Sequence, residues 1–257
     1  MPGSTNEAAR KGGALAVALS VIAAVALAIA LVAAGLAACC ARPTTAVLSQ
    51  ATSADYASPY SKGTLIDLAV ATRDYTVDGI PRADVLEQIM AAASAEAPEV
   101  LADSDDPAIA LANANERYTL TEDALSHLDD VYAVISTAAP ALAACAIIAL
   151  ASLIALGFAG GRRRVGMTLI AAPLVVIVAF ALLAAWVVID FNGFFAAFHS
   201  LFFANGTWTF SADSLLICMY PPDFWIGMGA VWLAATLLAS ALAIAAGIAI
   251  KGKKSRS

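Results

Sequence analysis

Four long, uninterrupted apolar segments constrain this chain more than any other feature of its sequence. They cover residues 12–38, 131–158, 165–189 and 224–250, and no Asp, Glu, Lys or Arg lies well inside any of them. Each is longer than the ~20 residues that a helix needs to cross ~30 Å of hydrocarbon. Hydrophobic residues make up 61% of the chain, more than is typical of soluble domains. We therefore predict an all-α membrane protein with four transmembrane helices.

The basic residues predict the orientation of these helices. The three segments 1–11, 159–164 and 251–257 must share one side of the membrane, and they hold nine of the fourteen basic residues but one of the twenty acidic ones. The other side comprises residues 39–130 and 190–223, with five basic and nineteen acidic residues. Because Lys and Arg concentrate in cytoplasmic segments, both termini are predicted to be cytoplasmic. The acidic exterior gives no indication of nucleic-acid binding.

The longer outer segment is predicted to form a small, mostly helical extracytoplasmic cap. Residues 42–62 are rich in Ser, Thr, Ala and Pro, and are predicted to be an extended linker. Apolar spacing predicts short helices over 64–75 and 82–95, the second with Pro81 in its first turn, and residues 103–107 indicate a turn. Aromatic residues are too few here for a large independent core, so we expect the cap to pack on the helix ends.

The second outer segment is unusually aromatic. Six phenylalanines lie within residues 191–203, around His199, and Trp208 and Phe210 follow. Because aromatic side chains favour the headgroup level of a bilayer, this segment is predicted to contain a helix lying in or dipping through the outer interface. The pair Pro221-Pro222 should end it before the last apolar segment.

The four cysteines, at positions 39, 40, 145 and 218, have no spacing typical of a metal site. A disulfide from Cys39 or Cys40 to Cys218 stays open, since all three are predicted to lie outside the cytoplasm. Residues 36–39 resemble the cleavage site before a lipid-modified cysteine. The apolar run before them is nearly twice the ~7–15 residues of a signal peptide, so a retained first helix is favoured over lipidation of Cys39.

The only two histidines, His127 and His199, fall on the same predicted side of the membrane. His127 precedes the second apolar segment and His199 follows the third. Imidazole titrates near neutral pH and suits proton transfer, although a single interfacial histidine is more often a structural anchor. Their shared location favours a site.

The sequence around His127 predicts a helix that continues into the second transmembrane segment. Thr119 and Glu122 match a capping box at its start. Asp123, His127 and Asp130 then fall at positions i, i+4 and i+7, so carboxylate, imidazole and carboxylate share one face.

Several kinds of chemistry are conceivable for the histidine pair. Zinc held by both histidines with Asp130 or Asp213 lacks any supporting spacing, and no Gly-x-Ser-x-Gly motif indicates a serine hydrolase. Transport fits poorly, because the apolar segments lack buried ionisable residues. General acid–base catalysis remains, on a substrate that brings its own nucleophile, with no metal and no cofactor predicted.

Two motifs in the sequence resemble those of a known family. The first is His127-Leu-Asp-Asp-Val131, and the second spans residues 198–225, with Phe-His-Ser-Leu-Phe-Phe, Gly206-Thr-Trp-Thr-Phe and Pro221-x-x-Phe. With four apolar segments and an outer cap, the chain resembles the lipoprotein intramolecular transacylase (Lit) family of integral membrane proteins.

The resemblance implies a reaction in the bacterial cell membrane, with a diacylated lipoprotein and membrane lipids as partners. An acyl chain would move from the diacylglyceryl group of the lipoprotein's N-terminal cysteine to the α-amino group of the same cysteine, giving a lyso-form lipoprotein. His127 and His199 would act as acid and base in an order left open, with Asp130, Asp213 and Trp208 in support. The alternatives are a non-enzymatic membrane scaffold or sensor that uses its acidic cap, and a metal-dependent membrane hydrolase.

Overall fold

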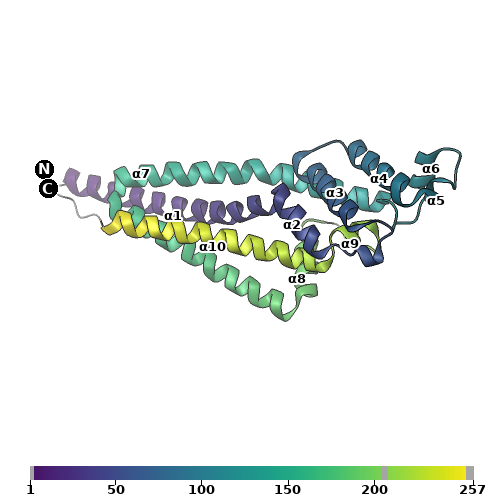
Figure 1. Ribbon diagram of the computed structural model, residues 1–257. Coiled ribbons are helices and arrows are strands. Elements are labelled where there is room, and N and C mark those ends of the chain that lie inside the picture. The colour runs from purple at the N-terminus through teal and green to yellow at the C-terminus, as the bar shows by residue number, and fades with distance from the viewer. Residues whose placement is uncertain (1–2, 204–207, 253–257) are drawn as a thin grey trace. The chain divides into compact units, whose positions relative to one another are not determined.

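The computed structural model describes residues 3–203 and 208–252, with side chains from residue 12 onward, and every regular element in that part of the chain is a helix (Figure 1). The all-α prediction is therefore confirmed for these residues. Residues 253–257 of the predicted cytoplasmic tail lie outside the described ranges. The elements are α1 (Gly3–Cys39), α2 (Arg42–Thr52), η1 (Asp55–Ala57), α3 (Lys62–Arg73), η2 (Asp74–Asp78), α4 (Arg82–Glu96), α5 (Pro98–Leu101), α6 (Pro107–Ala112), α7 (Glu122–Ile189), α8 (Phe191–Ser200), α9 (Leu215–Met219) and α10 (Pro222–Gly252).

The chain divides into two compact units. We call the first the bundle unit; it comprises residues 1–37, 138–190 and 232–257. The second, the head unit, comprises residues 38–137 and 191–231.

The bundle unit is built from apolar helices. Within the described residues, α1, α7 and α10 are long and apolar enough to cross a membrane. The 68-residue α7 is not continuous, because Gly161 has φ 75° and ψ 168°. This backbone conformation is open to glycine and strained for other residues. In Figure 1 the chain reverses direction within α7.

Close helix packing holds α1 against α10 in the bundle unit. A Cβ atom on Gly35 would lie 2.8 Å from the backbone oxygen of Trp232 and 2.2 Å from Oγ1 of Thr236. The Trp232 indole N–H donates to the carbonyl of Val32 at 3.1 Å, and its ring packs edge-on against Phe180 with centroids 5.1 Å apart. Small residues at such contacts let helices approach closely, which is how helices associate in lipid.

The head unit has one buried core to which several elements contribute. Its largest fully buried apolar side chains come from the cap, from α9 and from the start of α10: Tyr60, Leu65, Leu68, Val85, Ile89, Leu215, Met219 and Phe224. The Tyr60 hydroxyl donates to the Tyr118 carbonyl at 2.6 Å, which joins two distant parts of the cap. The core that the cap lacks alone is thus completed by residues after 214.

The prediction of an extended linker over residues 42–62 is wrong at its start. Residues 42–52 form α2, with Pro43 in its first turn and Thr45 and Ser49 buried. Ser and Thr are weak helix formers, and their frequency here suggested a linker. Packing decides instead, because most helical stability in proteins comes from tertiary contacts. The helices predicted over 64–75 and 82–95 are present as α3 and α4.

The start of α7 differs from the predicted capping box. Thr121 is the capping residue, since its hydroxyl accepts from the N–H of Ala124 at 3.3 Å. Thr119 lies buried before it, and the carboxylate of Glu122 pairs with Arg82 at 2.6 Å. The helix therefore begins two residues later than the capping box predicts, with a different cap.

The four cysteines are all free thiols. The disulfide left open between Cys39 or Cys40 and Cys218 is therefore not formed. Cys218 is fully buried in the core of the head unit.

Candidate active site

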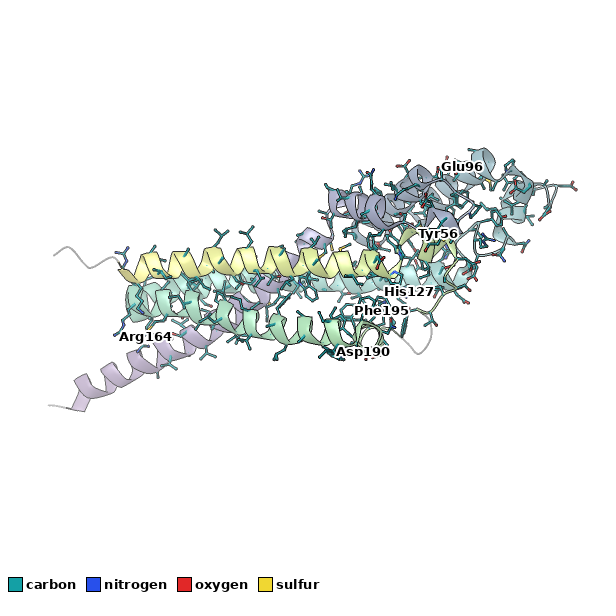
Figure 2. The ribbon with its side chains drawn as sticks, turned by 60° about the horizontal axis from the view of Figure 1, so that its bottom comes forward. Tyr56, Glu96, His127, Arg164, Asp190 and Phe195 are labelled. Carbon is teal, nitrogen blue, oxygen red and sulfur yellow. The ribbon has the colours of Figure 1, made fainter. Side chains whose placement is uncertain are left out.

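The two histidines face each other in the head unit. His127 lies on the second turn of α7, and His199 is the penultimate residue of α8. Their ring centroids are 6.3 Å apart and their planes differ by 27°. Figure 2 shows His127 beside Phe195, which precedes His199 by one helical turn. Residues 72 positions apart in sequence thus form one pair.

His199 has one nitrogen fixed by the backbone. Its Nδ1 lies 2.9 Å from the carbonyl oxygen of Phe195, within the last turn of α8. A carbonyl oxygen only accepts hydrogen bonds, so Nδ1 must carry the hydrogen. In the neutral imidazole the lone pair then lies on Nε2. His199 is therefore oriented as a base through Nε2.

His127 is buried and less constrained. Its Nδ1 has no hydrogen-bond partner among the described residues. Burial and, to a smaller extent, neighbouring His199 lower the pKa of His127 to about 4, and Asp130 partly opposes both effects. His127 is consequently neutral at physiological pH, with one N–H to donate.

Aromatic rings enclose both imidazoles. Around His127 the ring centroids of Phe203 and Phe210 lie at 4.7 Å and 5.8 Å. Around His199 those of Phe195 and Trp208 lie at 4.0 Å and 4.9 Å. Burial among them lowers the pKa of His199 as well, although the bond to the Phe195 carbonyl acts in the opposite direction. An apolar shell disfavours the charged form of an imidazole, so the pair is kept neutral.

The predicted supporting residues have different surroundings. Trp208 packs on His199, as described above, and Asp130 is exposed on α7 close enough to influence His127. Asp213 forms an ion pair with Arg117, whose Nε lies 3.5 Å from Oδ2. The structure therefore gives Asp213 an arginine partner instead of the expected histidine. Gly206 of the second motif lies outside the described residues.

The zinc alternative finds no ligand set in the described ranges. No group of three or more His, Cys, Asp and Glu side chains in those ranges could hold a metal ion. The hydroxyl of Ser200 is also occupied locally, since it donates to the carbonyl of Ala197 at 2.8 Å.

Sequence reasoning missed the role of Phe195 and the placement of Phe203 and Phe210. The available signal was the spacing of four residues between Phe195 and His199, which places an imidazole over a carbonyl in a helix's last turn. Chemically, the site offers one oriented base and one neutral N–H donor in an apolar enclosure.

A family model and the similar solved structures indicate the same family. A model of the lipoprotein intramolecular transacylase Lit family matches residues 82–225, and a comparison with curated proteins found no match. Among solved structures, the membrane-integral lipoprotein intramolecular transacylase Lit from Bacillus cereus is similar, with 16% identity and a TM-score of 0.62 over 95% of this chain and 100% of that one. A variant of that protein, with one histidine replaced by arginine, gives 15% identity and a TM-score of 0.65 over 96% of each chain. At this identity the structural likeness shows a shared fold.

Proposed function

The chain belongs to the Lit family of lipoprotein intramolecular transacylases and is thus a transferase, and from that premise we propose its reaction. It moves an acyl chain from the diacylglyceryl group on a lipoprotein's N-terminal cysteine to the α-amino group of the same cysteine, and releases the lyso-form. The observation that carries the mechanism is the enclosed histidine pair, with ring centroids 6.3 Å apart. A non-enzymatic scaffold is not favoured, because the family is one of transferases.

The site is proposed to lie on the extracytoplasmic face of a bacterial cell membrane, crossed four times. The non-helical backbone at Gly161 supports this count, since it divides α7 into two segments that are each long enough to span. The asymmetry of basic residues supports cytoplasmic ends for the chain. A lipoprotein substrate anchored in the outer leaflet would then reach the head unit directly.

The reaction needs no nucleophile from the protein, because the substrate's amine attacks. Nε2 of His199 accepts a proton from the amine as its nitrogen bonds to the ester carbonyl carbon. The negative oxygen that develops accepts a hydrogen bond from the N–H of neutral His127. When the ester C–O bond breaks, the imidazolium of His199 returns the proton to the glyceryl oxygen. One proton and one acyl group have then moved between two atoms of the same substrate.

The surroundings of the pair suit an intramolecular transfer. The amine and the ester already belong to one molecule, so the protein needs only to hold them in a productive geometry. The rings of Phe195, Phe203 and Trp208 exclude water around the imidazoles, which strengthens the hydrogen bond to the oxyanion. Asp130 partly opposes the lowering of the His127 pKa, and Asp213 is held by its ion pair with Arg117.

Mass spectrometry of a lipoprotein N-terminus tests this proposal. The host should lack other enzymes that acylate the amino group, and the protein should be expressed in it as the native sequence, His127→Ala, His199→Ala and Ser200→Ala. We expect the N-acylated lyso-form with the native protein and with Ser200→Ala, whose side chain contacts its own helix. Each histidine variant should lower product formation by about 10²–10⁴-fold, the usual contribution of a general acid or base. A lyso-form that is absent with the native protein, or retained in both histidine variants, would contradict the mechanism.

A further inference from the structure

The helix that carries His127 also contacts the cap, through the face opposite the imidazole. Asp129 follows His127 by two residues in α7, which places it about 200° around the helix axis at 3.6 residues per turn. One face of α7 therefore presents the imidazole to the site, while the other presents Asp129 to the cap. The side-chain hydroxyl of Tyr75, itself buried, donates a hydrogen bond to the carboxylate of Asp129.

Further contacts reinforce this attachment on the same face. The guanidinium of Arg82 lies 2.6 Å from the carboxylate of Glu122 and 3.9 Å from that of Asp129. These two carboxylates are about two helical turns apart and therefore share one face of α7. Further along α7, the ring of Tyr132 lies over Gly79, 3.1 Å from where a Cβ atom would be. Gly79 has φ 73° and ends the turn that carries Tyr75. The contacts span the first three turns of α7.

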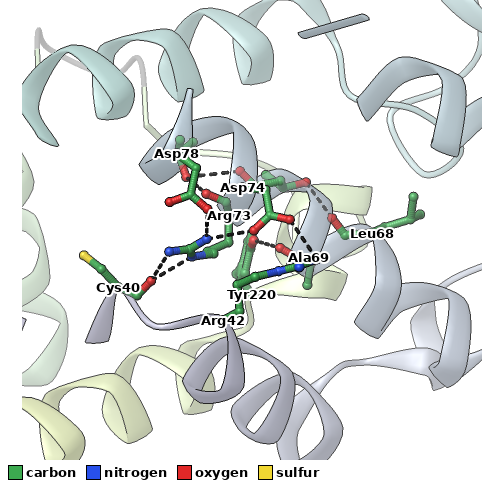
Figure 3. A network of polar contacts seen from close by, with 10 residues as sticks. Cys40, Arg42, Leu68, Ala69, Arg73, Asp74, Asp78 and Tyr220 are labelled. Atoms are coloured by element: carbon green, nitrogen blue, oxygen red, sulfur yellow. Dashed lines mark hydrogen bonds and ion pairs between the residues drawn. The ribbon is translucent and has the colours of Figure 1, made fainter. Parts of the chain in front are cut away.

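Tyr75 itself sits on a fixed platform, the π-helical turn η2. Arg73, just before it, donates to the carbonyl of Cys40 through Nε at 2.7 Å and through a second guanidinium nitrogen, and pairs with Asp74 and Asp78 (Figure 3). Arg42 pairs with Asp74 at 2.9 Å from the first turn of α2. Turns of the π type are uncommon and are often found at functional sites. One side of the turn therefore pairs with α2, through Asp74, and the other contacts α7, through Tyr75.

We propose that Tyr75 is a positioning residue, whose hydrogen bond to Asp129 fixes the rotation of α7 and thereby holds His127 in register with His199. The role follows from placement, since Tyr75 of η2 contacts Asp129 on the face of α7 opposite the imidazole. A loosened helix would displace His127 relative to its partner. Misplacement of a reacting group by about 1 Å can lower a rate by about 10²-fold. The consequence for activity rests on the proposed function; the consequence for His127 does not.

The test compares three variants of the full-length protein. Tyr75→Phe removes one hydroxyl without changing charge, and Asp129→Asn weakens the same bond at a half-exposed position that should tolerate the change. Glu96→Gln is the matched control, since this carboxylate accepts hydrogen bonds from Ser61 and Thr64 and so joins α4 to α3 within the same unit. All three variants lose polar contacts of the head unit, but only the first two concern α7.

Two measurements are needed on each variant. The first is NMR of histidine-labelled protein, where the two histidines give two sets of imidazole signals. The charged or titratable groups acting on His127 are His199 of α8 and Asp130 of α7. Neither is altered, so a displaced ring would report lost burial as a titration midpoint moving from about 4 toward 6.5. The second is the kinetics of acyl transfer, with kcat and KM separated.

We expect Tyr75→Phe and Asp129→Asn to raise the His127 midpoint and to lower kcat by about ten-fold or more, with KM within about two-fold. The double variant should lower kcat by less than the product of the two single-variant losses, because Tyr75 and Asp129 share one hydrogen bond. Glu96→Gln should change neither quantity. If Tyr75→Phe fails to fold, Asp129→Asn decides.

Unchanged titration of His127 in the Tyr75 and Asp129 variants would overturn the positioning role. An equal change in Glu96→Gln would also overturn it, since general loosening of the cap would then be responsible. A shifted His127 titration with unaltered acyl transfer would uphold the positioning role and would instead count against His127 in the proposed reaction.

Discussion

The imidazoles of His127 and His199 share a shell of aromatic rings, and that shell determines the protonation state in which they work. A carboxylate in direct contact with an imidazole would raise its pKa and favour the charged form. Here burial among Phe195, Phe203 and Trp208 acts in the opposite direction and lowers the pKa of both histidines. Neutral imidazoles are what the proposed chemistry requires, one as a base and one as an N–H donor.

The lowered pKa of His127 predicts a loss of stability in mild acid. In the folded protein this pKa is about 4, against an ordinary value of 6.5. Between about pH 6.5 and pH 4, His127 therefore binds a proton in the unfolded chain and stays neutral in the folded one. The free energy of unfolding consequently falls as the pH drops through this range. His127→Gln cannot titrate, and its apparent melting temperature should fall less steeply over this window. Circular dichroism of the detergent-solubilised protein measures both.

A second prediction concerns Trp208, whose ring lies 4.9 Å from that of His199. An aromatic contact of this kind contributes about 0.5–1.5 kcal/mol, which corresponds to about two- to twelve-fold in a rate. Trp208→Ala should lower kcat/KM by that factor, while Trp208→Phe should keep most of the activity. Trp225→Ala serves as a comparison, because that ring packs on Phe195, Tyr220 and Phe224. An equal loss in Trp225→Ala would indicate general packing.

At the scale of elements, the sequence predicted those helices whose ends carry strong signals. Pro81 precedes α4 and Pro222 begins α10. Proline is favoured at the start of a helix, because its missing N–H would have no partner within the helix there. The sequence did not predict α2, because this helix is stabilised by packing that buries Thr45 and Ser49, and no local sequence pattern indicates that packing. The cap of α7 was misplaced by two residues for the same reason, since Thr119 is buried in the head unit.

The tight contact of α1 with α10 supplies a prediction at this scale. Gly35→Ala would place a Cβ atom 2.8 Å from the Trp232 backbone oxygen, and backbone cannot yield as a flexible side chain can. Overpacking of this kind usually costs about 1–3 kcal/mol, so the apparent melting temperature should fall. Gly229→Ala is the matched control, because nothing lies within 4 Å of its Cβ position in α10. A fall of equal size in both variants would rule out the contact as the cause.

For the whole molecule, the membrane topology is predicted by the distribution of apolar and charged residues and not by the chemistry of any one residue. The apolar segments predict the long helices, and the nine basic residues at their ends predict an orientation that stays a prediction. The meeting of His127 with His199 could not be deduced from spacing, because it depends on how α8 lies against the start of α7. Asp213 illustrates the same limit: its place in the sequence suggested a histidine partner, whereas folding brings Arg117 to it.

Orientation in the membrane is testable on the whole chain by cysteine labelling in intact cells. In a background where the four native cysteines are replaced by Ala, Tyr56→Cys and Arg163→Cys would each provide one thiol. Tyr56 is 92% exposed in the head unit, and Arg163 is exposed beside the break in α7. A membrane-impermeant maleimide should label Tyr56→Cys in intact cells and Arg163→Cys after permeabilisation alone, because basic links are retained in the cytoplasm. Labelling of Arg163→Cys in intact cells, with Tyr56→Cys protected, would put the histidine pair in the cytoplasm, away from a lipoprotein anchored in the outer leaflet.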